Sequence, residues 1–234
     1  MTFPTRGQPL RVESLRDTEQ GGVSARLSGL PTPVRQLHRE VLRAFLATGQ
    51  PPHSDDLPLI GGVDRGDAFG QLTELDVVQV GADGRALVAY PFSGRPTGHT
   101  VQLDGGPVLH AMCAIDALGI LLMTGRDGVI VSADPGTGHP VRVERRGEGW
   151  RWAPEDTAVL LAQSGGCGSA AECLCPTITF HTSRGRAEDH LRARPKLTGA
   201  VLDQAQAVEV ARRSFEALLG PDPETKLPTT QSRS

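Results

Sequence analysis

The feature that most constrains this chain is the apolar stretch 111–119, Ala-Met-Cys-Ala-Ile-Asp-Ala-Leu-Gly, which carries a thiol and a carboxylate three positions apart. Its composition favours a helix packed on most sides, and a helix would place Cys113 and Asp116 on one face. A carboxyl group among such neighbours is poorly solvated, so we expect burial to raise the pKa of Asp116. A thiol beside a carboxyl that holds a proton near neutral pH suits chemistry on a soft metal.

The same pair of residues also has a purely structural interpretation. Buried cysteines often act only as small apolar side chains. An aspartate near the start of a helix commonly caps it or interacts with its dipole. Taken alone, this stretch favours the structural interpretation, and the balance changes only with a second stretch about sixty residues later.

That second stretch holds three of the four cysteines, Cys167, Cys173 and Cys175, in a segment rich in Gly, Ala and Ser. Loops carry function, and glycine lets the backbone approach a ligand closely. The alternating residues 177–183 predict a strand that begins just after Cys175. Cys175 is therefore expected to be a rigid thiol at the edge of a loop.

Several kinds of site use clustered thiols. The spacing Cys-x5-Cys-x-Cys is not that of a zinc finger, and a structural zinc site would need a fourth ligand from Cys113 or His181. A redox pair of Cys173 and Cys175 lacks a thioredoxin-like context. Two thiols from distant segments with an acid between them would bind a soft metal and supply a proton.

Composition and charge limit the cellular setting and the partners. The 234 residues fit one large domain or two small ones, and a net charge of −3 gives no basic field for nucleic acid. No apolar run reaches the length of a membrane span, and the first residues lack the apolar core of a signal peptide. We therefore expect a cytoplasmic protein without a membrane partner, in which cysteines are ligands, catalytic thiols or buried residues rather than disulfides.

Hydrophobic periodicity predicts the organisation of the first part of the chain. Residues 1–30 are polar and aperiodic, and we expect a flexible arm. Helical spacing over 34–46, a short helix capped by Ser54 and helical spacing over 64–75 precede a hairpin signal around 81–84. Three helices followed by a hairpin predict a winged-helix-like module over residues 31–90.

A winged helix often binds DNA, but the charges here argue against it. The candidate recognition stretch 65–74 carries one arginine against two acids, whereas a helix in the major groove usually brings several basic residues to phosphates. We expect no nucleic acid partner, and favour a scaffold or lid over the following region.

The second half, residues 91–220, mixes strand and helix signals. Strands are predicted near 100–103, 129–133, 141–144 and 157–161, and helices near 187–193 and 202–219. This pattern predicts an α+β class with a mixed, mainly antiparallel sheet core and flanking helices. Tyr90 and Phe92, at the junction of the two parts, are expected to be core residues. Residues 221–234, rich in Pro, Thr and Ser, are expected to form a flexible tail.

The run from Met112 to Leu118, followed at long range by the run from Cys175 to Ser183, resembles the bacterial organomercurial (alkylmercury) lyase family. The resemblance covers residues 31–219 and includes the family's N-terminal winged-helix-like module and its C-terminal helix. It implies that Cys113 and Cys175 are the catalytic cysteines and that Asp116 is the catalytic aspartate. It also implies that thiolates capture the mercury of R–Hg⁺, that the carbon is protonated by way of Asp116, and that Hg(II) stays bound by these residues as product.

The resemblance implies that no added cofactor is required. Its implied partners are an organomercurial or related substrate, low-molecular-weight thiols, and a mercuric reductase as acceptor of Hg(II). The chain departs from the family pattern at Met112, where the family has an aromatic residue, and at Pro176, where another cysteine often follows. Cys173 and Cys167 are then either relay ligands for Hg(II) or incidental loop thiols.

Two alternatives to a lyase follow from the same residues. The first is a thiol-based protein that binds or transfers a soft metal on the same fold without cleaving a carbon–mercury bond. The second is a metal-responsive regulator that uses the winged-helix half, against which the acidic recognition stretch counts.

Overall fold

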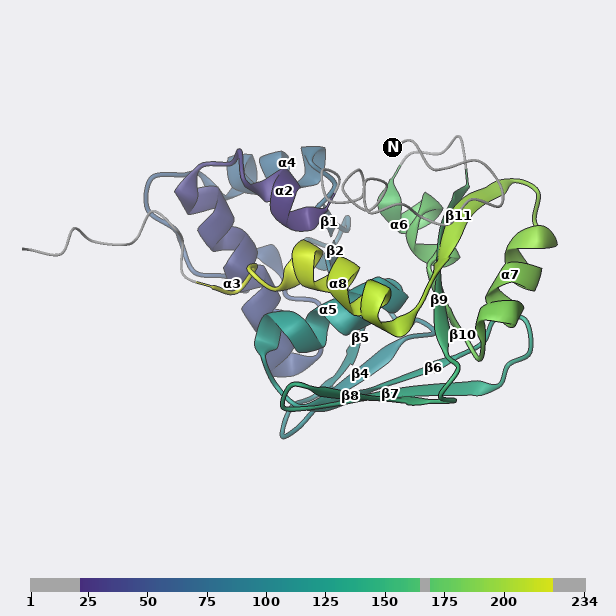
Figure 1. The fold of residues 1–234 in the computed structure, drawn as a ribbon. Coiled ribbons are helices and arrows are strands. Elements are labelled where there is room, and N and C mark those ends of the chain that lie inside the picture. Colours follow the sequence, from purple (N-terminus) through teal and green to yellow (C-terminus); the bar gives the residue numbers. More distant parts are fainter. Residues whose placement is uncertain (1–21, 165–168, 221–234) are drawn as a thin grey trace, which may run out of the picture.

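The computed structural model describes residues 22–164 and 169–220, which form three sheets surrounded by helices (Figure 1). The strand orders are β1-β2-β3, β5-β4-β6-β7-β8 and β10-β9-β11, and every strand pair within the described ranges is antiparallel. The predicted α+β class, with mainly antiparallel strands, is confirmed. None of the described helices has both the length and the apolar character needed to cross a membrane.

The first part of the chain is mainly helical. Its elements are α2 (Val23–Leu27), α3 (Thr32–Thr48), η1 (Ser54–Asp56), α4 (Arg65–Glu74), β1 (Val78–Val80), β2 (Ala86–Ala89) and β3 (Phe92–Ser93). Both longer helices, the short turn at Ser54 and the β1–β2 hairpin lie where periodicity predicted them. At the short turn, His53 rather than Ser54 is the N-cap residue.

The prediction of a flexible arm over residues 1–30 is wrong for the last residues of that stretch. Helix α2 lies inside the stretch 1–30, and its apolar pair Val23 and Leu27 is buried, because these residues four positions apart face one side of the helix, which contacts α8. Residues 1–21 of the predicted arm and the predicted tail from 221 lie outside the described part of the chain.

The second part contains most of the strands. They are β4 (Thr100–Leu103), β5 (Val108–His110), β6 (Gly128–Ala133), β7 (Pro140–Arg146), β8 (Gly149–Ala153), β9 (Ala158–Ser164), β10 (Thr179–His181) and β11 (Leu197–Leu202). Sequence analysis missed β5, β8 and β11. β5 has only three residues, and β8 lies at a sheet edge where a single residue, Trp152, is fully buried, so neither gives a clear hydrophobic period.

The helices of this part are α5 (Ala114–Thr124), α6 (Ala170–Cys173), η2 (Cys175–Thr177), α7 (Arg184–Arg192) and α8 (Gln204–Phe215). The sequence predicted that the last helix begins at Leu202, but Leu202 ends β11. Helix α8 begins two residues later, where Asp203 and Gln206 form a capping box.

Helix α5 lies at the centre of the molecule, between the five-stranded sheet and α8 (Figure 1). Ten of its eleven residues are buried. The close approach of α8 depends on Gly119, because a methyl group there would overlap the Phe215 ring and lie 3.1 Å from its Cβ. Burial on all sides gives the first turn of α5 dry surroundings.

We predict that Gly119→Ala destabilises the protein although alanine favours helices. The added methyl group must displace Phe215 near its attachment to α8, so the free energy of unfolding in urea should fall by about 1–3 kcal/mol. The matched control is Gly70→Ala in α4, where the added Cβ meets open space and helix propensity should raise stability by up to about 1 kcal/mol. Equal changes in the two variants would contradict this view of the α5–α8 contact.

Candidate active site

Cys113 is the N-cap residue of α5. Its backbone is extended, with φ −155°, and its Sγ accepts a hydrogen bond of 3.4 Å from the backbone N–H of Asp116. The sequence placed Cys113 inside the helix, whereas the helix begins at Ala114. The predicted proximity still holds, because the cap residue and the third helical residue meet through this hydrogen bond.

Cys175 reaches the same place from a distant segment. It begins the turn η2, whose Thr177 hydroxyl donates to the Ala162 carbonyl of β9. The next residue, Ile178, accepts a hydrogen bond of 3.1 Å from the backbone N–H of Ala114 at the start of α5. These bonds fix Cys175 against the first turn of α5, four positions before the short strand β10.

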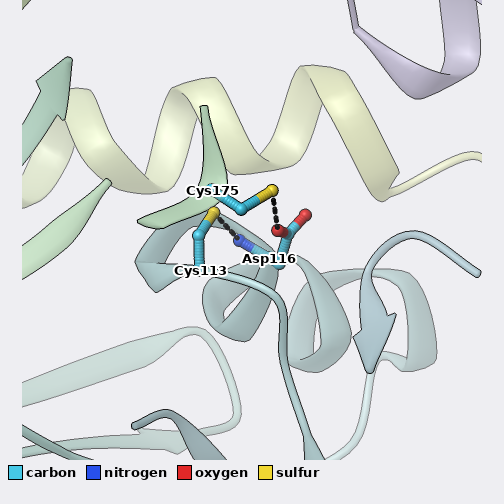
Figure 2. A group of neighbouring side chains, drawn as sticks. All are labelled: Cys113, Asp116 and Cys175. Atoms are coloured by element: carbon cyan, nitrogen blue, oxygen red, sulfur yellow. Dashed lines mark hydrogen bonds between the residues drawn. The ribbon is translucent and has the colours of Figure 1, made fainter. Parts of the chain in front are cut away.

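The three side chains converge (Figure 2). The Sγ of Cys175 lies 3.9 Å from Oδ2 of Asp116, and the ligating atoms of Cys113, Asp116 and Cys175 all lie within 4.8 Å of one another. Both thiols are free of disulfides. It is the one cluster of three or more potential metal ligands found among the described residues.

Burial governs the protonation of this site. The exposed fractions of Cys113, Asp116 and Cys175 are 2%, 4% and 5%. Desolvation raises the pKa of Asp116 to about 7, against the opposing effects of its hydrogen bond with Cys113 and the charge of Arg26. The predicted rise of this pKa is confirmed. Burial also raises the pKa of Cys113 well above its usual value, and a hydrogen bond with Cys175 and the charge of Asp116 add to the rise.

A small cavity of about 80 Å³ adjoins the three residues. Most of its wall is apolar and comes from α2, β9, α8 and the segment around Cys175; these residues are Val23, Leu161, Leu174, Ile178, Val210 and Phe215. A cavity of this size and character has room for a small apolar group beside the sulfur atoms.

Two polar residues of the cavity wall, Arg26 and Tyr90, escaped sequence analysis as site residues. Tyr90 was expected to be a core residue, and its exposed fraction of 2% confirms this prediction. Its hydroxyl nevertheless makes no hydrogen bond of normal geometry among the described residues, although it has a polar interaction with Cys175. No spacing rule connects Arg26 or Tyr90 with Cys113, since only the tertiary fold brings them together.

Of the other predicted ligands, the structure describes the side chain of His181 alone. Cys167 lies outside the described residues, and for Cys173 the structure gives only its backbone place at the end of α6. His181 is buried on β10, where its Nδ1 lies 3.6 Å from Oδ1 of Asp134 and its Nε2 lies 3.0 Å from the Thr179 hydroxyl. The suggestion of His181 as a fourth zinc ligand is therefore not supported.

The fold and this site define a class of protein: an α+β protein with a buried cysteine–aspartate–cysteine cluster suited to a soft metal ion. The model of one family, alkylmercury lyase, matches residues 92–216, which is more than half of the sequence. The chain therefore belongs to the alkylmercury lyase family.

Individual relatives agree with this assignment. An alkylmercury lyase of Staphylococcus epidermidis is 29% identical over 177 residues, which cover 75% of this chain and 80% of the relative. An alkylmercury lyase of Bacillus cereus is 28% identical over 180 residues, covering 76% and 80%. The crystal structure of the mercury-bound form of MerB2 has the same fold, with a TM-score of 0.71 and 22% identity over 87% of this chain and 99% of that one.

We predict that Asp116 makes stability depend on pH. Its folded-state pKa of about 7 lies above the usual 3.8, so between these values the folded protein holds a proton that the unfolded chain has lost. Stability therefore falls as pH rises through this window. Asp116→Asn removes the effect, and from pH 5 to pH 8 the variant should gain roughly 2–3 kcal/mol in free energy of unfolding relative to wild type.

The measurement is denaturant unfolding of the reduced protein at both pH values. Asp67→Asn is the matched control, because Asp67 also lies in the first turn of a helix, α4, but is exposed. A wild-type protein and an Asp116→Asn variant with parallel pH dependence would contradict the raised pKa.

Proposed function

We propose that this protein breaks the carbon–mercury bond of an organomercurial by protonolysis, with Cys113 and Cys175 as mercury ligands and Asp116 as proton carrier. The observation that carries the proposal is the convergence of two buried thiols and one buried carboxyl within 4.8 Å. Membership of the alkylmercury lyase family supports the same reaction.

The residue types fit each step of this reaction. Mercury is a soft ion for which thiolates are strong ligands. Binding of R–Hg⁺ by both cysteines releases two thiol protons, one of which Asp116 takes up. The carbon–mercury bond then breaks with its electron pair on carbon, and the carbon takes the proton from Asp116. The balance is R–Hg⁺ and two thiols giving R–H, Hg(II) bound by two thiolates, and one proton.

The raised pKa of Asp116 makes this proton transfer practicable. A general acid works best when its pKa lies near the operating pH, because a large fraction of it is then protonated and it is still acidic enough to donate the proton. An exposed aspartate would be ionised at neutral pH. Desolvation brings the pKa of Asp116 to about 7, so the carboxyl can receive a thiol proton and deliver it to carbon.

The raised pKa of Cys113 explains why the thiolates form with the substrate and not before it. A buried thiolate without a cation is unfavourable, so the thiol keeps its proton in the free protein. The arriving mercury cation supplies the missing positive charge. The apolar cavity wall then accepts the organic group R beside the metal.

The same proposal covers the cofactor requirement, the acceptors of Hg(II) and the role of the N-terminal part. We propose that no cofactor is needed, since the residues supply ligands and proton, and that small thiols followed by a mercuric reductase accept Hg(II). The helices α3 and α4 followed by β1, β2 and β3 have the order of a winged-helix module. We propose that this module acts as a scaffold beside the site.

The test of the function is headspace gas chromatography of the reduced protein with methylmercury and excess small thiol. We expect methane over many turnovers, and none from Cys113→Ala, because that variant lacks a metal ligand. Stoichiometric Hg(II) binding without methane would overturn the lyase assignment and favour a soft-metal-binding protein on this fold.

A second prediction separates binding from protonation. Asp116→Ala should retain mercury binding, because both thiols remain, while hydrocarbon release in a single turnover falls at least about 100-fold with the loss of the proton carrier. Cys175→Ala should abolish turnover. Mercury titration and quenched single-turnover assays measure the two effects separately.

The loop cysteines provide the comparison for these variants. Cys167→Ala and Cys173→Ala should leave single-turnover cleavage nearly unchanged and at most slow the transfer of Hg(II) to small thiols. If Cys167→Ala stops the cleavage step, the second metal ligand has been assigned to the wrong thiol.

A further inference from the structure

We propose that the hydroxyl group of Tyr90 is a further catalytic group of this site, which donates a hydrogen bond to the Cys175 sulfur while mercury is bound. Tyr90 lines the same cavity as Cys113, Asp116 and Cys175, although it comes from the connection between β2 and β3. The inference rests on the proposed function, and its test is arranged so that the two can fail separately.

The first observation is the state of the hydroxyl group. Tyr90 is 2% exposed, and its Oη makes no hydrogen bond of normal geometry within the described residues, although it interacts weakly with the Cys175 sulfur. A buried hydroxyl without a partner costs free energy, on the order of 1–3 kcal/mol. Such a group beside a metal-binding cluster is explained if its weak approach to Cys175 becomes a full hydrogen bond only during the reaction.

The second observation is the precise support of the tyrosine. Its backbone N–H donates to the Val77 carbonyl over 3.2 Å, and the following Pro91 carbonyl accepts a hydrogen bond of 3.2 Å from Met112. Phe92 then pairs with Ala111. The segment that carries Tyr90 is thereby joined to the residues directly before Cys113.

The face of the ring is also fixed. The Arg26 guanidinium carbon lies 5.7 Å from the centre of the Tyr90 ring, within the range of a cation–π contact. Arg26 is held in turn, because its Nη1 donates to the carbonyl oxygens of Leu75 and Asp76. With Arg26 on its face and backbone bonds on both sides, the ring has little freedom to turn its hydroxyl away.

The negative charge of the reacting site calls for a hydrogen-bond donor. R–Hg⁺ bound by two thiolates carries one net negative charge, and after cleavage this charge lies on Asp116. A negative charge in an apolar cavity is unfavourable unless hydrogen bonds stabilise it. The Tyr90 O–H, which makes no hydrogen bond of normal geometry among the described residues of the free protein, can serve this purpose.

Electrostatics agrees with the sulfur as acceptor. Burial raises the pKa of Tyr90 far above its usual value, the charges of Cys175, Asp76 and Asp116 raise it further in that order, and a hydrogen-bonding interaction with Cys175 adds to the rise. The hydroxyl therefore keeps its proton at any physiological pH and remains a donor.

The first arm of the test is Tyr90→Phe, which removes the oxygen atom and keeps the ring. Hydrogen bonds to charged groups are among the stronger ones, so the thiolate complex with methylmercury forms less readily without the donor. At methylmercury concentrations below saturation we expect the single-turnover rate of methane release to fall about tenfold, equivalent to about 1.4 kcal/mol. Thermal stability should be unchanged or higher, because the variant loses an unpaired buried group. If the tyrosine served only packing, the variant would release methane at the wild-type rate, with thermal stability lower than or equal to that of the wild type.

The control for the first arm is Ser132→Ala. Ser132 is also a buried hydroxyl, but it bonds to His99 over 2.9 Å, on the five-stranded sheet and away from the cavity. This variant should cleave at the wild-type rate. A Tyr90→Phe rate within twofold of wild type would overturn the inference while leaving the lyase function intact.

The second arm uses Hg(II) alone and needs no catalysis. Tyr90 is the sole tyrosine of the sequence, so protein labelled with carbon-13 at tyrosine Cζ gives one signal from this residue. We expect Hg(II) to shift the signal in wild type and also in Asp116→Ala, because the acceptor is sulfur. No shift on stoichiometric binding would overturn the inference, and a shift in a protein that releases no methane would uphold it while the lyase function fails.

Discussion

The structure of the site depends above all on the removal of water from the first turn of α5. That helix is buried on all sides, between the five-stranded sheet and α8, and Gly119 allows Phe215 of α8 to lie directly on it. The consequence is chemical. An acid that would be ionised in water holds a proton near pH 7, and the pKa of the Cys113 thiol beside it is raised well above its usual value. Desolvation is the largest cause of both shifts in pKa.

The same constraint decides between the structural and functional interpretations of Cys113 and Asp116. The structural interpretation gave the capping role to Asp116, but the N-cap residue is Cys113, although serine, threonine and aspartate are the side chains that cap helices well. A buried carboxyl with a raised pKa also lowers the stability of the protein at neutral pH. A sequence selected only for folding would avoid both choices. Perturbed groups of this kind cluster at functional sites.

The region before residue 92 contributes to the site although the family model begins only there. Arg26 on α2 and Tyr90 after β2 form part of the cavity wall. The Asp76 carboxylate, which lies 3.8 Å from Arg26, accepts a hydrogen bond of 2.8 Å from the backbone N–H of Ala170 at the start of α6. That helix leads directly to Cys175, so the N-terminal part supports the segment that delivers the second thiol. Its interpretation as a scaffold stays a prediction, but these contacts give it a physical basis.

The sequence predicted what depends on local periodicity and chemistry. Helical spacing located α3 and α4, the Gly-rich turn located the β1–β2 hairpin, and an apolar run around a single acid predicted the raised pKa of Asp116. It failed where the signal is short or tertiary. The strand β5 is too short to show a hydrophobic period. The apolar pair Val23 and Leu27 of α2 is buried through contact with the distant helix α8, which the local sequence does not indicate. Arg26 and Tyr90 could not be found from spacing, because their place beside Cys175 depends on how distant segments pack.

One net negative charge accounts for why the site contains these polar groups and few others. In the proposed reaction the charge begins on the thiolates that hold R–Hg⁺ and ends on Asp116, so the free energy of both states depends on the same surroundings. A strongly cationic cavity would stabilise the carboxylate too well and lower the pKa that proton delivery requires. A wholly apolar cavity would oppose the formation of either anion. Arg26, whose Nη1 donates to the carbonyl oxygens of Leu75 and Asp76, lowers the pKa of Asp116 by less than burial raises it. A neutral donor such as Tyr90 stabilises negative charge on sulfur without adding a full positive charge. The few polar groups of the wall therefore suit a proton that must be both held and released.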